Sequence, residues 1–237
     1  MEAIRNWAVS VWEQFEFNII QGDRYLMLLD GLGVTVTVAF FAALIGMAAG
    51  CLIALMRLSN LRIGKWYPLR WISTIYVDVI RGTPVVVQLL IMYFIIMVAY
   101  KGPKTVVAII SFGLNSAAYV SEIIRGGILS VDKGQTEAGR SLGLSSAATM
   151  SLIVLPQAFK IVLPSMGNEF ITLLKETSVV GFIGLMDLTK AGDYIRSRTY
   201  SAFFPLIIVA AAYLIIVSAL SKLLARLERK VRQGDQH

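Results

Sequence analysis

Long apolar blocks without charge alternate with short polar segments along this chain. Uncharged blocks cover residues 32–56, 83–100 and 201–221, and a slightly shorter one covers 105–121. About 20 apolar helical residues cross the roughly 30 Å hydrocarbon layer of a membrane, because each residue rises about 1.5 Å. Each block therefore predicts a transmembrane helix.

A fifth crossing is expected between residues 156 and 188, although this stretch is polar. It contains Asn168, Glu169, Thr172, Lys175 and Glu176. A charged side chain at the bilayer centre costs at least about 2.5 to 3.5 kcal/mol, so these residues should face other helices or a water-filled cavity. Without this crossing, the basic segments before and after it would lie on opposite sides of the membrane, against the positive-inside rule.

The pattern predicts an all-α polytopic membrane protein with five spans, over about 31–56, 83–100, 105–125, 161–186 and 202–224. Most of the 22 basic residues then fall on one side, which places the N-terminus outside and the C-terminus in the cytoplasm. Glu2 and Glu13 interrupt the apolar residues of 1–25, so this segment is expected to be amphipathic and interfacial. Residues 231–237 are expected to form a polar tail.

The amino-acid composition agrees with a membrane protein and argues against several other classes of protein. The 237 residues are 57% hydrophobic and only 16% charged, with a mean hydropathy of +0.70. The net charge of +7 is scattered at the ends of apolar blocks, so topology explains it better than nucleic-acid binding. Cys51 is the only cysteine and His237, the last residue, the only histidine, so neither a disulfide, a metal site nor histidine-dependent catalysis is expected.

The polar segment 128–158, between the third and fourth spans, has the features of a helical hairpin. Residues 131–142 favour a helix that stops at Gly143, and Ser145 or Ser146 can cap a second helix that Pro156 would end. Periodicity alone leaves open whether this hairpin is an ordinary surface feature or a docking element.

The residues of this hairpin carry a resemblance to a known family. Glu137-Ala138-Gly139, then Gly143, and after nine residues Ile153, Leu155 and Pro156, resemble the EAA loop of ABC importer permeases, E-A-A-x3-G-x9-I-x-L-P. Gly139 departs from the motif, which usually has a second alanine there. Further segments resemble the branch that carries polar amino acids such as histidine, arginine, lysine and glutamine: Arg81-Gly82-Thr83-Pro84, the run 117–128, Gly134-Gln135, LPQAF at 155–159 and LLKETS at 173–178.

The resemblance covers about residues 25–230 and implies that the loop docks into a groove on a cytoplasmic ATPase subunit. Small residues would allow close approach, and Arg140 could pair with Glu137 at i, i+3. The chain has no G-x4-G-K-[ST] loop, so it should not hydrolyse ATP itself and no enzyme activity is expected of it. No cofactor is expected on this chain, and ATP and Mg would belong to the partner ATPase dimer. The residues implied in coupling are Glu137, Ala138, Gly139, Arg140, Gly143, Ile153, Leu155 and Pro156.

Two polar stripes inside the spans are candidates for the substrate path. Ser111, Asn115, Tyr119 and Glu122 share one face of the third span, and Ser165, Asn168, Thr172 and Lys175, with Glu176 beside them, follow a similar spacing on the fourth. If the stripes faced each other, Glu122 could bind an ammonium or guanidinium group and Lys175 a carboxylate. The residues predicted to bind substrate are Asn115, Tyr119, Glu122, Asn168, Thr172 and Lys175. Alternatively, Glu122 pairs with Arg125 near the cytoplasmic end.

We therefore expect the membrane-spanning subunit of an ABC importer in a bacterial inner membrane, which carries a polar amino acid, with basic amino acids among the candidates, by alternating access. The resemblance implies an extracytoplasmic binding protein as a partner. Five spans are too few to enclose a path, so a two-fold pair is expected, with an identical copy favoured over a sister permease. The alternative is an ion-coupled secondary transporter or channel that uses Glu122 and Glu176, and it predicts an internal repeat that the sequence lacks. An intramembrane enzyme is not supported, because the sequence lacks a catalytic histidine, paired aspartates within the spans and a G-x-S-x-G motif.

Overall fold

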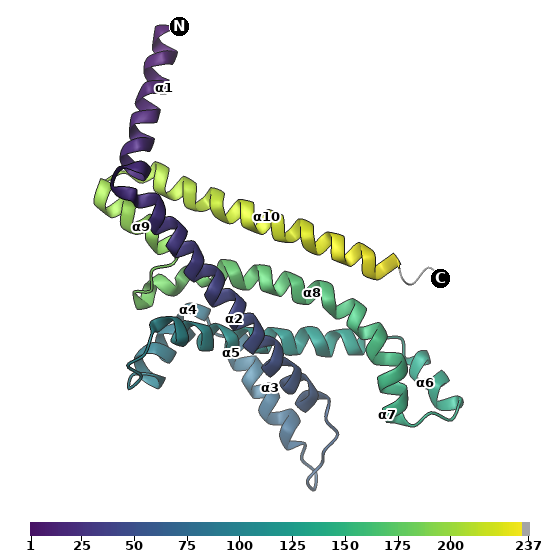
Figure 1. The fold of residues 1–237 in the computed structure, drawn as a ribbon. Coiled ribbons are helices and arrows are strands. Elements are labelled where there is room, and N and C mark those ends of the chain that lie inside the picture. Colours follow the sequence, from purple (N-terminus) through teal and green to yellow (C-terminus); the bar gives the residue numbers. More distant parts are fainter. Residues whose placement is uncertain (234–237) are drawn as a thin grey trace.

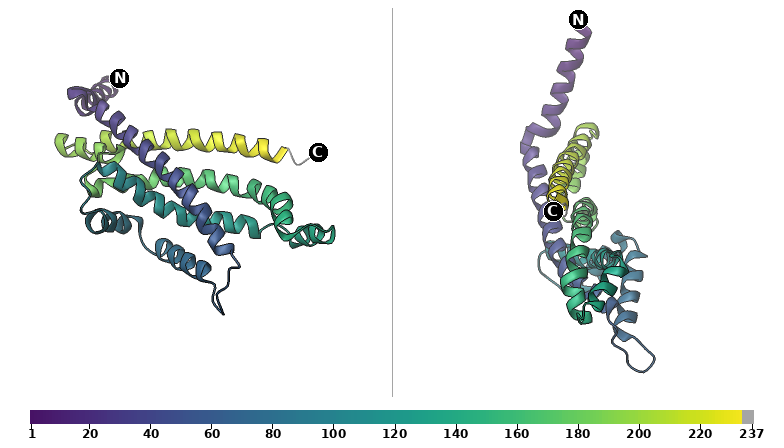
Figure 2. Two further views of the ribbon diagram at one scale, coloured as in Figure 1. Left: turned by 60° about the horizontal axis from the view of Figure 1, so that its bottom comes forward. Right: turned by 90° about the vertical axis from the view of Figure 1, so that its right-hand side faces the viewer.

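Four long helices form the body of the protein. The computed structural model describes residues 1–233, in which the long helices are α2 (Arg24–Leu58), α5 (Lys104–Leu129), α8 (Leu155–Glu176) and α10 (Phe203–Gln233). Helices α5, α8 and α10 run side by side, and α2 crosses them obliquely (Figure 1 and Figure 2). Residues 234–237, the end of the predicted polar tail, lie outside the described residues.

The N-terminal helix α1 (Glu2–Phe15) projects away from this body (Figure 1). Two short segments, η1 (Glu16–Ile20) and η2 (Gln21–Asp23), connect it to α2. Gly22 and Asp23 adopt positive φ angles of 66° and 52°, which interrupts the helical run before Arg24. The predicted N-terminal segment thus corresponds to α1 and its extensions, and its interfacial position stays a prediction. Helix α2 begins earlier than the expected span.

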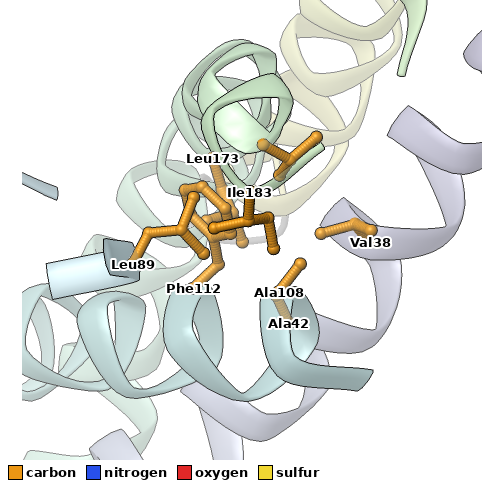
Figure 3. Close-up of a cluster of buried hydrophobic side chains, with 8 residues drawn as sticks. Val38, Ala42, Leu89, Ala108, Phe112, Leu173 and Ile183 are labelled. Carbon is orange, nitrogen blue, oxygen red and sulfur yellow. The ribbon is translucent and has the colours of Figure 1, made fainter. Parts of the chain in front are cut away.

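Close packing of α2 against α5 holds the centre together. Gly46 and Gly50 of α2 lie so near α5 that an added Cβ would come within 2.8 Å of the Cβ of Ser116 and 2.7 Å of the Cβ of Val120. Small residues let membrane helices approach closely, which increases their van der Waals contact. Buried side chains from α2, α4, α5, α8 and η5 (Thr177–Ile183) meet beside this contact, among them Leu89, Phe112 and Leu173 (Figure 3).

The second predicted span, over 83–100, differs from the structure. The helical part there covers only α4 (Val85–Ile91) and its π-helical extension η3 (Met92–Ile96), and a preceding helix, α3 (Pro68–Arg81), meets it at an angle of 107°. The break lies at Gly82–Pro84, because Pro84 has no amide hydrogen to continue a helix and forces the residue before it away from helical geometry. The uncharged run of sequence gave no sign of this bend.

The hairpin between α5 and α8 consists of α6 (Lys133–Ser141), α7 (Ser146–Thr149) and the π-helical segment η4 (Met150–Val154). It lies at one end of the helical body, away from α9 (Figure 1). Helix α7 continues through η4 into α8 without a break in the helical chain. The hairpin is therefore attached to the core by a continuous helix.

Helix α9 (Leu188–Thr199) closes the opposite end of the body between α2 and α10. Its N-cap is Asp187, which is fully buried and accepts hydrogen bonds from the amides of Thr189 at 3.2 Å and Lys190 at 2.9 Å. Burial raises the pKa of the Asp187 carboxyl. The Thr189 hydroxyl lies 3.2 Å from the Tyr213 hydroxyl, so a polar junction connects α9 to α10.

The number of spans agrees with the prediction when the bent pair is counted once. Within the described residues, four helices are long and apolar enough to cross a membrane, and the pair α3 with α4 and η3 gives a fifth. An all-α membrane protein of this kind satisfies its backbone hydrogen bonds within each helix, as hydrocarbon requires.

The contact between α2 and the start of α9 generates a stability prediction. A Cβ added to Gly31 would lie 2.7 Å from the backbone carbon and oxygen of Asp187, whereas one added to Gly33 would meet nothing within 4 Å. Gly31→Ala should lower the free energy of unfolding by about 1 to 3 kcal/mol, because backbone atoms must shift. Gly33→Ala makes the same chemical change in open space and should not destabilise the protein. Thermal unfolding in detergent measures both, and equal midpoints would contradict the close contact.

Candidate functional site

The hairpin at 128–158 is the first candidate site, and the structure has the predicted turn at Gly143 and cap at Ser145, whereas its first helix begins at Lys133, two residues later than expected. The Asp132 carboxylate accepts a hydrogen bond from the Gly134 amide at 2.6 Å and caps α6, and the Ser145 hydroxyl accepts one from the Ala148 amide at 3.2 Å and caps α7. Gly143 ends α6 with a φ of +85°, a conformation that glycine adopts without a steric penalty. The two short helices therefore meet at a defined angle.

Pro156 does not end the second helix, contrary to the prediction. It lies in the first turn of α8, and the π-helical segment η4 directly precedes it. A proline in the first helical turn is tolerated, since the amide hydrogen it lacks has no partner there in an ordinary helix start. The wider π turn before Pro156 allows the chain to pass from α7 into α8.

The departure from the EAA pattern at Gly139 has a local explanation. Gly139 is the one buried residue of α6, and an added Cβ would come within 2.8 Å of the Ile153 side chain and 2.9 Å of the Thr149 side chain. Glycine thus allows α6 to pack directly on η4. Glu137, Ala138 and Arg140 are exposed, and Leu142 at the tip is 83% exposed. The exposed surface of α6 and the turn therefore combines two charged side chains, Glu137 and Arg140, with the apolar side chain of Leu142.

The suggested pair between Arg140 and Glu137 is not formed. The Arg140 guanidinium donates instead to the Leu144 carbonyl at 2.8 Å, across the turn that follows α6. This contact satisfies a carbonyl oxygen in the turn and leaves the Glu137 carboxylate facing solvent.

The second candidate site is the polar stripe of α5. Its one acidic residue, Glu122, is surrounded by arginine side chains. Glu122 forms ion pairs with Arg57 of α2 and, at 2.8 Å, with Arg125, and the Arg81 guanidinium lies 3.9 Å away. The Glu122 side chain is only 19% exposed. The structure therefore agrees with the alternative in which Glu122 pairs with Arg125. Arg57 of α2 also pairs with Glu122, and Arg81 of α3 lies close to it.

Two further residues of this stripe are engaged inside the chain. Asn115 is 3% exposed and donates to the Gln88 side-chain oxygen at 2.9 Å. The Gln88 amide group donates to the carbonyl of Ile80 at 2.7 Å and to that of Thr83 at 3.1 Å. The Arg81 guanidinium lies 5.5 Å from the centre of the Tyr119 ring, a cation–π contact. Asn115 and Tyr119 therefore support the bend between α3 and α4.

The stripe of α8 does not face that of α5 within one chain. Ser165, Asn168, Thr172 and Lys175 share one face of α8 and all are exposed, whereas Ser111 and Asn115 are buried. The facing arrangement expected from the sequence is absent because α5 turns its polar residues toward α4 and the core. The exposed stripe of α8 is free to meet another molecule.

Two carboxylates of α8 were missed as substrate-binding candidates. Glu169 lines a groove of about 990 Å³ between α2, α5, α8 and α10, and it accepts a hydrogen bond from the Ser116 hydroxyl of α5 at 3.0 Å. Glu176 follows seven residues later, which places it on the same side of the helix. The spacing of two acids within a predicted span was the available signal, because intramembrane acids usually have a function.

The ion cluster generates a prediction that separates structure from recognition. Glu122→Gln would leave Arg57 and Arg125 without their counter-charge in a partly buried site. The free energy of unfolding should fall by about 1 to 3 kcal/mol, and transport of neutral and cationic solutes should fall equally. Glu13→Gln, at an exposed position of α1 outside both candidate sites, is the matched control. A selective loss of cation transport would contradict the structural role.

Comparison with known proteins gives a consistent family. Residues 46–233 match the model of the binding-protein-dependent transport system inner membrane component family. The chain is 39% identical over 210 residues to the arginine transport system permease protein of Bacillus subtilis, covering 88% of this chain and 94% of that protein. It is 37% identical over 219 residues to a putative glutamine transport system permease protein of Rickettsia bellii, covering 92% and 98%.

Solved structures agree with these relatives. A crystal structure of an amino acid ABC transporter with histidines superposes with a TM-score of 0.81 at 42% identity, covering 87% of this chain and 94% of that one. A methionine ABC transporter in an inward-facing conformation has a TM-score of 0.75 at 19% identity, which supports the fold alone. With the family match over most of its length and these identities, the chain belongs to the binding-protein-dependent transport system inner membrane components, as a membrane-spanning permease.

Proposed function

We propose that this chain is the permease subunit of an ATP-driven importer for a polar amino acid, and that its hairpin transmits the motion of a partner ATPase to the substrate path. The observation that carries the proposal is the continuous helical connection from the hairpin through η4 to Glu169 on α8. A force on the hairpin would move α8 directly. An ion-coupled transporter is not favoured, because the family matched over 46–233 is a family of binding-protein-dependent components.

The hairpin is suited to dock on a cytoplasmic ATPase. Its exposed face offers Glu137, Ala138, Arg140 and Leu142, while Gly139 and Ile153 are used inside the hairpin to hold its shape. Leu155 and Pro156 act by joining the hairpin to α8 rather than by contact with the partner. ATP and Mg belong to the ATPase dimer, and an extracytoplasmic binding protein would deliver the solute at the other end.

Carboxylates of α8 are suited to bind the cationic group of an amino acid. Glu169 is held by Ser116, and Glu176 lies on the same side of the helix two turns away. An ammonium or guanidinium group bound between two carboxylates forms charge-assisted hydrogen bonds, which are strong in a poorly solvated site. The Bacillus subtilis relative is named for arginine and the Rickettsia bellii relative for glutamine, both polar amino acids.

The exposed stripe of α8 favours a path formed between two permeases. Asn168, Thr172 and Lys175 face away from the rest of the chain, so a second copy would bring two such stripes together across a two-fold axis. An identical copy is proposed because the stripe carries both neutral and basic groups and can pair with itself. The basic residues favour an outside N-terminus and a cytoplasmic C-terminus.

The docking role can be tested at the turn of the hairpin. Gly143→Val places a β-branched residue at a φ of +85°, which should distort the turn and reduce the co-purifying ATPase at least about tenfold. Gly126→Val in α5, where an added Cβ would meet nothing within 4 Å, is the matched control. Leu142→Asp alters only the exposed tip and should also reduce association. Undiminished ATPase recovery with both hairpin variants, at normal membrane levels, would argue against docking through this hairpin.

The substrate role can be tested by comparing amino acids of different charge. Glu169→Gln and Glu176→Gln should each raise the KM for arginine uptake about tenfold or more, with an effect under about threefold on glutamine, because a lost carboxylate affects mainly the cationic group. Proteoliposomes of the complete complex, supplied with ATP, give both values. Equal losses for arginine and glutamine in both variants would indicate that these acids are structural.

A further inference from the structure

A basic pocket lies where α2, α3 and α5 meet, at the end of the body from which the hairpin projects. The pocket has a volume of about 470 Å³ and receives side chains from the end of α2, the start of α3, the end of α5 and the loop after α2. Its lining residues are Arg57, Leu58, Ser59, Asn60, Arg70, Thr74, Arg125 and Leu129. No part of the proposed transport path uses this pocket.

The pocket carries a surplus of positive charge. Three of its lining residues are arginines from three different helices, and the carboxylate nearest to them is Glu122, which pairs with Arg57 and Arg125. Arg70 has no carboxylate partner among the described residues. Asp78, on the same helix as Arg70, is exposed and outside the lining. One carboxylate therefore opposes three guanidinium groups.

Neutral donors complete the lining. The Asn60 amide and the Thr74 hydroxyl can each donate a hydrogen bond to an anion, and the Ser59 hydroxyl already accepts one from the Leu61 amide at 3.1 Å and can donate its own hydrogen. Guanidinium groups form bidentate hydrogen bonds with phosphate oxygens, which makes arginine the usual residue for such anions. The chemistry of the pocket therefore suits a phosphate group.

The surroundings of the pocket have the composition of a membrane–water interface. The loop after α2 folds back through a bridge between Ile63 and Trp66, and it exposes Leu61, Ile63 and Trp66 by 55%, 67% and 67%. The Trp66 ring packs edge to face against Trp71 of α3, at 6.5 Å between centres. Exposed tryptophans beside basic residues are typical of the headgroup layer.

Helix α3 has the form expected beside that layer. Its exposed apolar residues Trp71, Ile72, Ile75 and Val79 share one side, whereas Arg70 and Thr74 lie on another side and line the pocket. A lipid whose acyl chains lie along the apolar side could place its headgroup over the pocket. Arg62 and Lys65 in the adjoining loop add positive charge near the opening.

We infer that this pocket binds the phosphate headgroup of an anionic phospholipid from the leaflet on the hairpin side. The bound lipid would complement Arg70 and hold α3 against the ends of α2 and α5. A phospholipid is favoured over a free anion because the apolar side of α3 and the exposed tryptophans supply contacts for acyl chains that a free anion cannot use. It is favoured over a carboxylate of the ATPase because the phosphate group can accept hydrogen bonds from several guanidinium groups at once.

Native mass spectrometry of the purified complex tests the inference. The probe is dioleoyl phosphatidylglycerol, compared with dioleoyl phosphatidylcholine, which has the same chains and no net charge. Arg70→Gln should weaken binding of phosphatidylglycerol about fivefold or more, because it removes a guanidinium group that lines the pocket and donates charge-assisted hydrogen bonds to the phosphate. Lys65→Gln removes the same charge from the adjoining loop, outside the pocket lining, and should change binding less than twofold. Arg70→Lys keeps the charge but not the bidentate hydrogen bonds, so its binding should lie between that of the unchanged protein and that of Arg70→Gln.

Each other outcome would overturn the inference. Equal weakening by the Arg70 and Lys65 variants would indicate general attraction of anionic lipid to a basic surface. Equal binding of the two lipids would exclude selection of the anionic headgroup. Displacement of phosphatidylglycerol by millimolar inorganic phosphate would identify a free-anion site, and loss of the ATPase with unchanged lipid binding in Arg70→Gln would identify a protein contact. Because bound lipid is read without transport, failure here leaves the proposed import function intact.

Discussion

The structure depends on the need of every polar group within the membrane to find a partner inside the protein. The bend at Gly82–Pro84 breaks a helix in the region of a predicted span, and it exposes carbonyl groups that hydrocarbon would leave without hydrogen bonds. Gln88 satisfies two of these carbonyls and is held in turn by Asn115. The bend can persist because this small network surrounds it.

The same requirement decides which polar residues remain available for a solute. Helix α5 uses Asn115 for the bend, Tyr119 for a cation–π contact and Glu122 for an arginine cluster, and the Ser111 hydroxyl is buried, so its polar stripe is turned into the fold. Helix α8 keeps its polar stripe exposed and holds Glu169 beside a groove. A path between two copies would therefore be built mainly from α8.

Much of the fold and part of the site follow from the sequence. Apolar blocks located the long helices, and the cap at Ser145 and the turn at Gly143 follow from local backbone chemistry. The bend at Pro84 and the passage of the helix through Pro156 could not be predicted from the sequence. A proline can end a helix or begin one, and the surrounding contacts decide which of the two occurs. Helical spacing identified the α5 stripe, but spacing does not say which neighbour a face meets.

The two prolines of α8 explain how a moving hairpin could affect a distant carboxylate. Pro156 and the π turn before it lie next to the hairpin, and Pro164 lies between them and Glu169. Pro164 lies inside the helix and removes one backbone hydrogen bond, and the turn before Pro156 is a π turn, so α8 can bend at these two points more easily than elsewhere. A stiff hairpin, packed through Gly139, would then deliver its displacement to the segment after Pro164. The Ser116 contact to Glu169 crosses between α8 and α5, so relative movement of these two helices would change the carboxylate's surroundings and its affinity for a cation.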